Sequence, residues 1–184
     1  MKPTIKKIAV YGMLTAVQVI LSRFLSINIT QTLKFSFGFV PLMLAAALYG
    51  IPGGCIVGFL SDILGALLFP SGPYFPGYTL ASIISGAIYG YFFKVSKLGS
   101  ALNIFINTLL AYLITAVIVT LGINTFCIAF QYGYLLTETH DAAAILPKFI
   151  ALLPKRAIQA AIMLPLQVLI SFILLTRIKH FDIK

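Results

Sequence analysis

Few side chains in this sequence could carry out acid–base or metal chemistry. The carboxylates and imidazoles are Asp62, Glu138, Asp141, Asp182, His140 and His180. The sequence contains no His-Glu-x-x-His pair to hold zinc and no Gly-x-x-x-x-Gly-Lys-Ser/Thr loop to bind nucleotide phosphates. With so few candidate acids and bases, we expect no catalytic activity, no metal and no cofactor.

Three aromatic residues are suited to binding a planar ligand. Tyr74, Phe75 and Tyr78 lie in or beside the segment 70–77, which contains three prolines. One interpretation is a belt of aromatic side chains at a membrane interface, although such belts favour Trp and the chain has none. The other is a set of stiff surfaces, held over a cavity, on which a flat ring can stack.

Three cations could bind an anionic ligand. Arg23 and Arg156 carry the planar fork that matches a carboxylate, and Lys34 carries a point charge. Gln159 follows Arg156 by three residues, so both fall on one face of a helix. Alternatively, Arg23 and the lysines extend to lipid headgroups or solvent.

The composition indicates what kind of element must position these residues. Of the 184 residues, 60% are hydrophobic and only 9% are charged, and the mean hydropathy is +1.05. Soluble domains carry about 25% charged residues. The composition therefore argues against a soluble enzyme, a disordered chain or a nucleic-acid-binding domain, and it predicts an all-α integral membrane protein.

Six segments are candidates for helices that cross the membrane, since a crossing takes about 20 mostly apolar residues. The breaks between them include Ile-Pro-Gly-Gly at 51–54 and the proline-rich segment 70–77, which we expect to be non-helical. Pro154 falls in the first turn of the last span. We predict one membrane domain, 1–184, folded as a six-transmembrane-helix bundle with an outward-facing ligand pocket. The expected spans are 8–27, 37–50, 55–69, 78–93, 101–121 and 154–176.

The basic residues predict the orientation. The chain has 13 Lys and Arg against 4 Asp and Glu, a net charge of +9. With the N-terminus inside, eight basic residues fall on the inner side and five on the outer, which favours both termini in the cytoplasm. The outer five are unexpected and suggest an anionic ligand. They are Arg23, Lys34, Lys148, Lys155 and Arg156.

Asp62 is the only acid inside an expected span. Placing a charge in hydrocarbon costs at least about 2.5–3.5 kcal/mol, so this carboxylate needs partners. A structural role would pair it with the hydroxyl of Ser82 or Thr79. A functional role would have it accept a hydrogen bond from a ligand, or pair with Arg23.

Small residues spaced four apart mark faces on which helices can approach closely. The pairs Gly54/Gly58 and Gly86/Gly90 are expected to pack inside the bundle. Gly12 and Ala16 leave one stripe of the first helix without bulk, and we expect this stripe to face a partner protein.

Four motifs, in order after the Gly12/Ala16 helix, carry a resemblance to a known family. They are Phe-Gly-Phe-Val-Pro at 37–41, Gly-Ile-Pro-Gly-Gly at 50–54, Gly-Phe-Leu-Ser-Asp-Ile-Leu-Gly at 58–65 and Phe-Pro-Ser-Gly-Pro-Tyr-Phe-Pro-Gly-Tyr-Thr-Leu at 69–80. Over nearly its whole length the chain resembles the substrate-binding S component of energy-coupling factor (ECF) vitamin transporters. The last motif, with Leu-Pro-Lys-Arg at 153–156, is most similar to the folate-specific members.

This resemblance implies a function and partners. An S component in the cell membrane binds its vitamin from outside and docks on a module of one transmembrane coupling protein and two ATPases. It then reorients while ATP hydrolysis drives uptake. Gly12 and Ala16 would form the docking surface, although family members often carry Ala-x-x-x-Ala there. Membrane lipid is expected around the bundle, and nucleic acid is not expected as a partner.

Folate would match the residues already singled out. Its flat pterin and aromatic linker suit stacking on Tyr74, Phe75 and Tyr78, and its dianionic glutamate suits the outer cations. Gln159 is the best candidate for a hydrogen bond to the pterin edge. The alternatives are an S component for another vitamin, such as riboflavin or a thiamine precursor, and, in other classes, a small oligomeric channel or a membrane enzyme.

Overall fold

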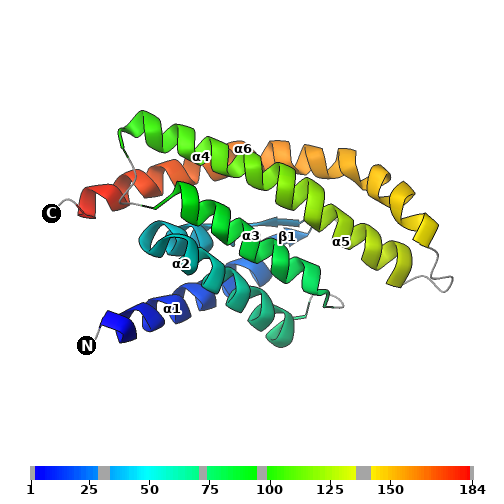
Figure 1. Ribbon diagram of the computed structural model, residues 1–184, viewed down its shortest axis with the longest axis horizontal. Coiled ribbons are helices and arrows are strands. Elements are labelled where there is room, and N and C mark those ends of the chain that lie inside the picture. Colours follow the sequence, from blue (N-terminus) through cyan, green and yellow to red (C-terminus); the bar gives the residue numbers. More distant parts are fainter. Residues whose placement is uncertain (1–2, 29–33, 71–73, 95–98, 136–141, 183–184) are drawn as a thin grey trace.

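The structure is a computed structural model that describes residues 3–28, 34–70, 74–94, 99–135 and 142–182. Its main helices are α1 (Pro3–Arg23), α2 (Phe39–Leu68), α3 (Pro76–Phe92), α4 (Ala101–Thr115), α5 (Thr125–Phe130) and α6 (Ile145–Asp182). The helices lie along one long axis, and both ends of the chain lie at the same end of the bundle (Figure 1).

Four of these helical stretches are long and apolar enough to cross a membrane. They have mean hydropathies from 1.4 to 2.3 and are Ile5–Arg23, Phe39–Leu68, Ala101–Phe130 and Ile145–Ile178. The described part of the chain is therefore a helical, multi-pass membrane fold, as the composition predicts. Two short strands, β1 (Ser26–Asn28) and β2 (Lys34–Ser36), form an antiparallel pair and are an exception to the all-α expectation.

Helix α2 is folded back on itself at Gly50. This glycine has φ 69° and ψ −152°, a left-handed backbone conformation that other residues rarely adopt. It divides α2 into two arms, 39–49 and 51–68. A Cβ atom at Gly58 would lie 3.4 Å from Leu42 Cδ1, although a straight helix would separate the two residues by about 24 Å. The arms therefore pack side by side. The predicted break at 51–54 is wrong in detail, because those residues are helical and the chain turns at Gly50.

The second arm of α2 crosses α3 at backbone contact. A Cβ atom at Gly54 would overlap the carbonyl group of Gly86, and one at Gly58 would lie 2.6 Å from the Ser82 carbonyl oxygen. A Cβ atom at Gly90 would overlap Ile51. The predicted packing role of the glycine pairs is thus confirmed: only residues without a side chain allow this approach.

Several expected boundaries differ from the structure. The first span ends at Arg23 rather than at 27, because the chain leaves the helix to form β1. Pro76 and Gly77, expected outside any helix, form the first turn of α3, where a proline needs no amide donor. Residues 71–73 of the proline-rich segment lie outside the described residues.

The fifth expected span continues well beyond residue 121. After α4 the chain forms wide π-helical turns in η2 (Ala116–Asn124), then α5, then a further π-helical stretch, η3 (Gln131–Leu135). The polar residues of this stretch, such as Asn124 and Gln131, do not end the helix. Helix α6 likewise begins at Ile145, so Pro154 lies inside it rather than in its first turn.

The contact between α2 and α3 generates a prediction about stability. Gly54→Ala places a methyl group against the Gly86 backbone, which cannot move aside as a flexible side chain would. We expect this variant to be less stable, with a free energy of unfolding about 1–3 kcal/mol below that of the parent, measured by thermal unfolding in detergent.

Gly12→Ala is the matched control, because a Cβ atom there meets nothing within 4 Å. Alanine also favours helix over glycine by up to about 1 kcal/mol, so this variant should be at least as stable as the parent. Equal melting temperatures for the two variants would contradict the proposed contact.

Candidate functional site

The helices enclose a polar cavity of about 530 Å³, a volume typical of small-molecule sites. Side chains from α1, both arms of α2, α3, the stretch from α4 to η3, and α6 line it. Five of the predicted ligand-binding residues are among the lining, together with Asp62. The five are Arg23, Tyr74, Tyr78, Arg156 and Gln159.

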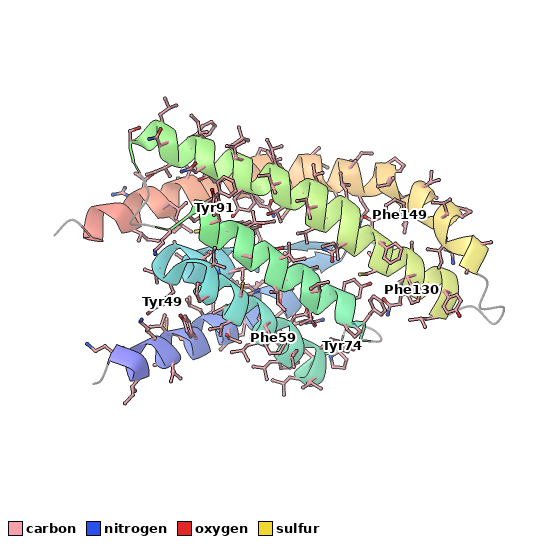
Figure 2. The ribbon with its side chains drawn as sticks, in the orientation of Figure 1. Tyr49, Phe59, Tyr74, Tyr91, Phe130 and Phe149 are labelled. Atoms are coloured by element: carbon pink, nitrogen blue, oxygen red, sulfur yellow. The ribbon has the colours of Figure 1, made fainter. Side chains whose placement is uncertain are left out.

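Two predicted residues are not among the lining. Phe75 lies beside the cavity, where its ring packs against Tyr78 at 6.1 Å and against Phe130 at 5.6 Å between centroids. Lys34 belongs to β2, but its side chain lies outside the described part of the structure. Tyr74 and Phe130 lie toward the end of the bundle opposite to Tyr49 and Tyr91 (Figure 2).

A chain of hydrogen bonds holds Asp62 on one wall. The Thr79 hydroxyl donates to Asp62 Oδ2 at 2.6 Å, which confirms one of the two structural partners expected for this acid. The Tyr74 hydroxyl lies 2.7 Å from Thr79 Oγ1. Since the single hydroxyl proton of Thr79 is used on Asp62, Tyr74 must be the donor in this second bond.

Arg23 reaches the same wall. Its guanidinium packs on Gly65, where a Cβ atom would meet Arg23 Nε at 3.0 Å. Gly65 follows Asp62 by three residues, so the two share a face of α2. A larger residue at position 65 would displace the guanidinium, so this glycine makes room for the cation at the edge of the cavity.

Helix α6 contributes the second arginine to the cavity. Arg156 and Gln159 are both buried, and Arg156 Nη1 donates to Gln159 Oε1 at 3.0 Å. Nearby, the Tyr78 hydroxyl donates to Gln131 Oε1 at 2.8 Å. This part of the cavity therefore offers a positive charge that is held in place by the neutral amide of Gln159, and a guanidinium of this kind can bind an anion.

Aromatic rings line another part of the cavity. Tyr112 meets Phe39 edge-on, with ring centroids 6.0 Å apart, and contacts Tyr89 at 5.1 Å. The Tyr112 hydroxyl shares a 2.6 Å hydrogen bond with Ser171. All three residues line the cavity but are almost fully buried, so they offer small apolar edges to a ligand rather than open ring faces.

The sequence reasoning missed several lining residues. Gln18, Gln131 and Gln167 face the cavity, as do Thr120 and Asn124 of η2. The sequence does contain an indication of these residues. A side-chain amide inside an apolar helix is energetically unfavourable in contact with lipid, so it is expected to face a polar interior. Wide π-helical turns also occur often at functional sites, but residue types do not reveal them.

A second, apolar hollow of about 300 Å³ lies between α1 and the second arm of α2. Gly12 and Ala16 line it and are exposed, and a Cβ atom on Gly12 would meet nothing within 4 Å. The stripe that the sequence singles out is thus an open surface rather than an internal contact. Its other lining residues include Thr15, Val19, Leu60, Leu64 and Leu68.

Comparisons with known proteins agree with this geometry. Residues 2–172 match the family described as ECF-type riboflavin transporter, S component. The folate transporter FolT of Clostridium novyi is 39% identical over 108 residues, which are 59% of this chain and 59% of that protein. The folate transporter FolT of Leuconostoc mesenteroides is 30% identical over 171 residues, or 92% of this chain and 84% of that protein.

A solved structure is also similar. The crystal structure of FolT bound with folic acid has a TM-score of 0.74 and 31% sequence identity, covering 94% of this chain and 95% of that chain. The resemblance expected from the motifs is therefore confirmed at the level of sequence and of fold.

The hydrogen-bond chain on the Asp62 wall predicts a stability effect. Thr79→Val removes the hydroxyl that donates to Asp62, and no other hydrogen bond to this carboxylate occurs among the described residues. We expect the free energy of unfolding to decrease by about 1–3 kcal/mol, measured by thermal unfolding.

Thr176→Val serves as the control. The Thr176 hydroxyl donates to the Phe172 carbonyl oxygen within its own helix, so its loss leaves no carboxylate without a donor. A Thr79→Val variant no less stable than Thr176→Val would show that the bond to Asp62 contributes little.

Proposed function

This chain belongs to the family of S components of ECF-type transporters, and from that premise we propose that its cavity binds folate for uptake into the cell. It is a transport component and not an enzyme. The observation that supports the proposal most strongly is the cavity itself. Two arginines, several tyrosines and several side-chain amides line it inside an apolar bundle. The two FolT relatives and the structure of FolT with folic acid support it.

The chemistry of the cavity suits the parts of folate. Arg156, buried beside Gln159, would bind a carboxylate of the glutamate, and Arg23 would bind or attract the other. The rings of Phe39, Tyr89 and Tyr112 would pack on the pterin or the linker. Tyr74 and Tyr78 would contact the ligand, while Phe75 would support Tyr78 from behind.

We also propose an orientation and a count of membrane crossings. Counting the arms of α2 separately, the chain crosses six times, with both termini in the cytoplasm. Lys94 and Arg177 lie near the ends of α3 and α6, on the side of the termini. This placement fits the positive-inside rule, and the cavity would then open outward.

The hollow beside Gly12 and Ala16 is proposed as the docking surface for the ECF module. Exposed small residues allow a partner helix to approach the α1 backbone closely. The partner would be the transmembrane coupling protein, which acts with two ATPases.

Lys34, predicted as a further ligand-binding residue, would add positive charge on the outer side.

Riboflavin is the second candidate ligand, because the matching family is described by that vitamin. Its isoalloxazine ring could stack on the same aromatic residues. It carries no carboxylate, however, whereas the guanidinium forks of Arg23 and Arg156 match the carboxylates of folate. We therefore favour folate.

Calorimetry on the purified protein in detergent tests the ligand. We expect saturable binding of folate at one site, with affinity falling at least about ten-fold in the Arg156→Ala variant as one charge-assisted hydrogen-bonded contact is lost. A pterin without any carboxylate, 6-hydroxymethylpterin, should be little affected by the same change. Binding of riboflavin without binding of folate would refute the folate assignment and leave the family membership intact.

Uptake assays in cells that carry an ECF module test the docking surface. Ala16→Leu fills the hollow beside α1, so we expect uptake to fall at least about ten-fold while folate binding to the purified protein is unchanged. Val17→Leu is the control, since Val17 is exposed on α1 but does not line the hollow. Normal uptake by Ala16→Leu would remove this surface from the mechanism.

A further inference from the structure

Gln18 on α1 is a buried amide whose hydrogen-bonding capacity the described part of the protein does not use. The residue is 8% exposed and lines the cavity. Its carbonyl oxygen is fully buried and has no hydrogen-bond partner among the described residues. By contrast, Gln131 and Gln159 in the same cavity accept hydrogen bonds from Tyr78 and Arg156.

An unsatisfied buried carbonyl oxygen lowers stability, so a native protein retains one only for a reason. Gln18 lines the cavity, so a ligand bound there can supply the missing partner. That partner has to be a hydrogen-bond donor. A carboxylate only accepts hydrogen bonds, so the two carboxylates of folate cannot satisfy Gln18 Oε1.

Gln18 lies apart from the cation on its own helix. It precedes Arg23 by five residues, or about 7.5 Å along α1. Both residues line the cavity, so a ligand that reaches from one to the other can place different groups against them. Among the polar parts of folate, the pterin edge carries donors and no carboxylate.

We propose that Gln18 hydrogen-bonds the polar edge of the ligand's heteroaromatic ring and thereby determines specificity. This inference rests on the proposed function. A pterin presents an N–H donor next to a carbonyl acceptor, and a side-chain amide matches both at once. A site built this way rejects ligands without that edge, because binding them leaves the buried amide unpaired.

Three ligands separate the ring from the anionic end. Folate has both, 6-hydroxymethylpterin has the pterin and no carboxylate, and p-aminobenzoylglutamate has the carboxylates and no pterin. For full-length Gln18→Leu in detergent, we expect the affinities for folate and 6-hydroxymethylpterin to fall about ten-fold and that for p-aminobenzoylglutamate to stay unchanged. Arg156→Ala should show the opposite pattern, losing affinity for folate and p-aminobenzoylglutamate and sparing 6-hydroxymethylpterin.

Thr15→Val is the matched control. Thr15 is also buried on α1 and its hydroxyl oxygen also lacks a described partner, but it lines the hollow beside Gly12 and not the ligand cavity. This variant should bind all three ligands as the parent does. Its normal binding would show that removing an unpartnered polar atom from α1 does not by itself disturb the site.

Thermal unfolding distinguishes a ligand-binding role of Gln18 from a structural one. Without ligand, Gln18→Leu should melt at or above the temperature of the parent, since an unsatisfied polar group has been removed. The rise in melting temperature on adding folate should be smaller. A lower melting temperature without ligand, combined with unchanged affinities, would overturn the inference and make Gln18 structural. Failure of the unmutated protein to bind folate would instead overturn the proposed function.

Discussion

The backbone contact between the second arm of α2 and α3 is the constraint on which the other features depend. Gly54 and Gly86 bring two helices together without intervening side chains. That approach sets Asp62 on one helix within 2.6 Å of Thr79 on the other. It also fixes the wall against which Arg23 rests. In lipid, where no hydrophobic effect drives helices together, such close packing is a main source of association.

Around this contact the fold segregates its polar groups. The outside of the bundle presents aliphatic side chains, and many large hydrophobic residues are exposed because lipid rather than water surrounds them. The inside carries the amides, hydroxyls and two arginines of the cavity. The π-helical turns of η2 contribute to this segregation. Within this stretch the Thr125 hydroxyl donates a 2.8 Å hydrogen bond to the Thr120 carbonyl oxygen, so this hydroxyl is satisfied inside its own helix.

Much of this arrangement could be predicted from the sequence, and the exceptions have physical causes. Charge in an apolar chain must face a polar interior or an interface, so Arg23, Asp62 and Arg156 could be found by type alone. The expected end of the fifth span at 121 came from the loop-like residues Gly122 and Asn124, although the chain stays mostly apolar as far as Phe130. Hydropathy does not show that Asn124 and Gln131 line the cavity. Spacing could not show that Phe75 packs on Phe130, since that contact joins segments far apart in the chain.

The reversal at Gly50 has a consequence for the surrounding bilayer. The arm 39–49 extends only about 16 Å, roughly half of the hydrocarbon thickness. A helix too short for the hydrocarbon layer is accommodated where the bilayer thins or where neighbouring helices cover the difference. We therefore expect lipids of shorter acyl chain to suit the side of the bundle that carries this arm.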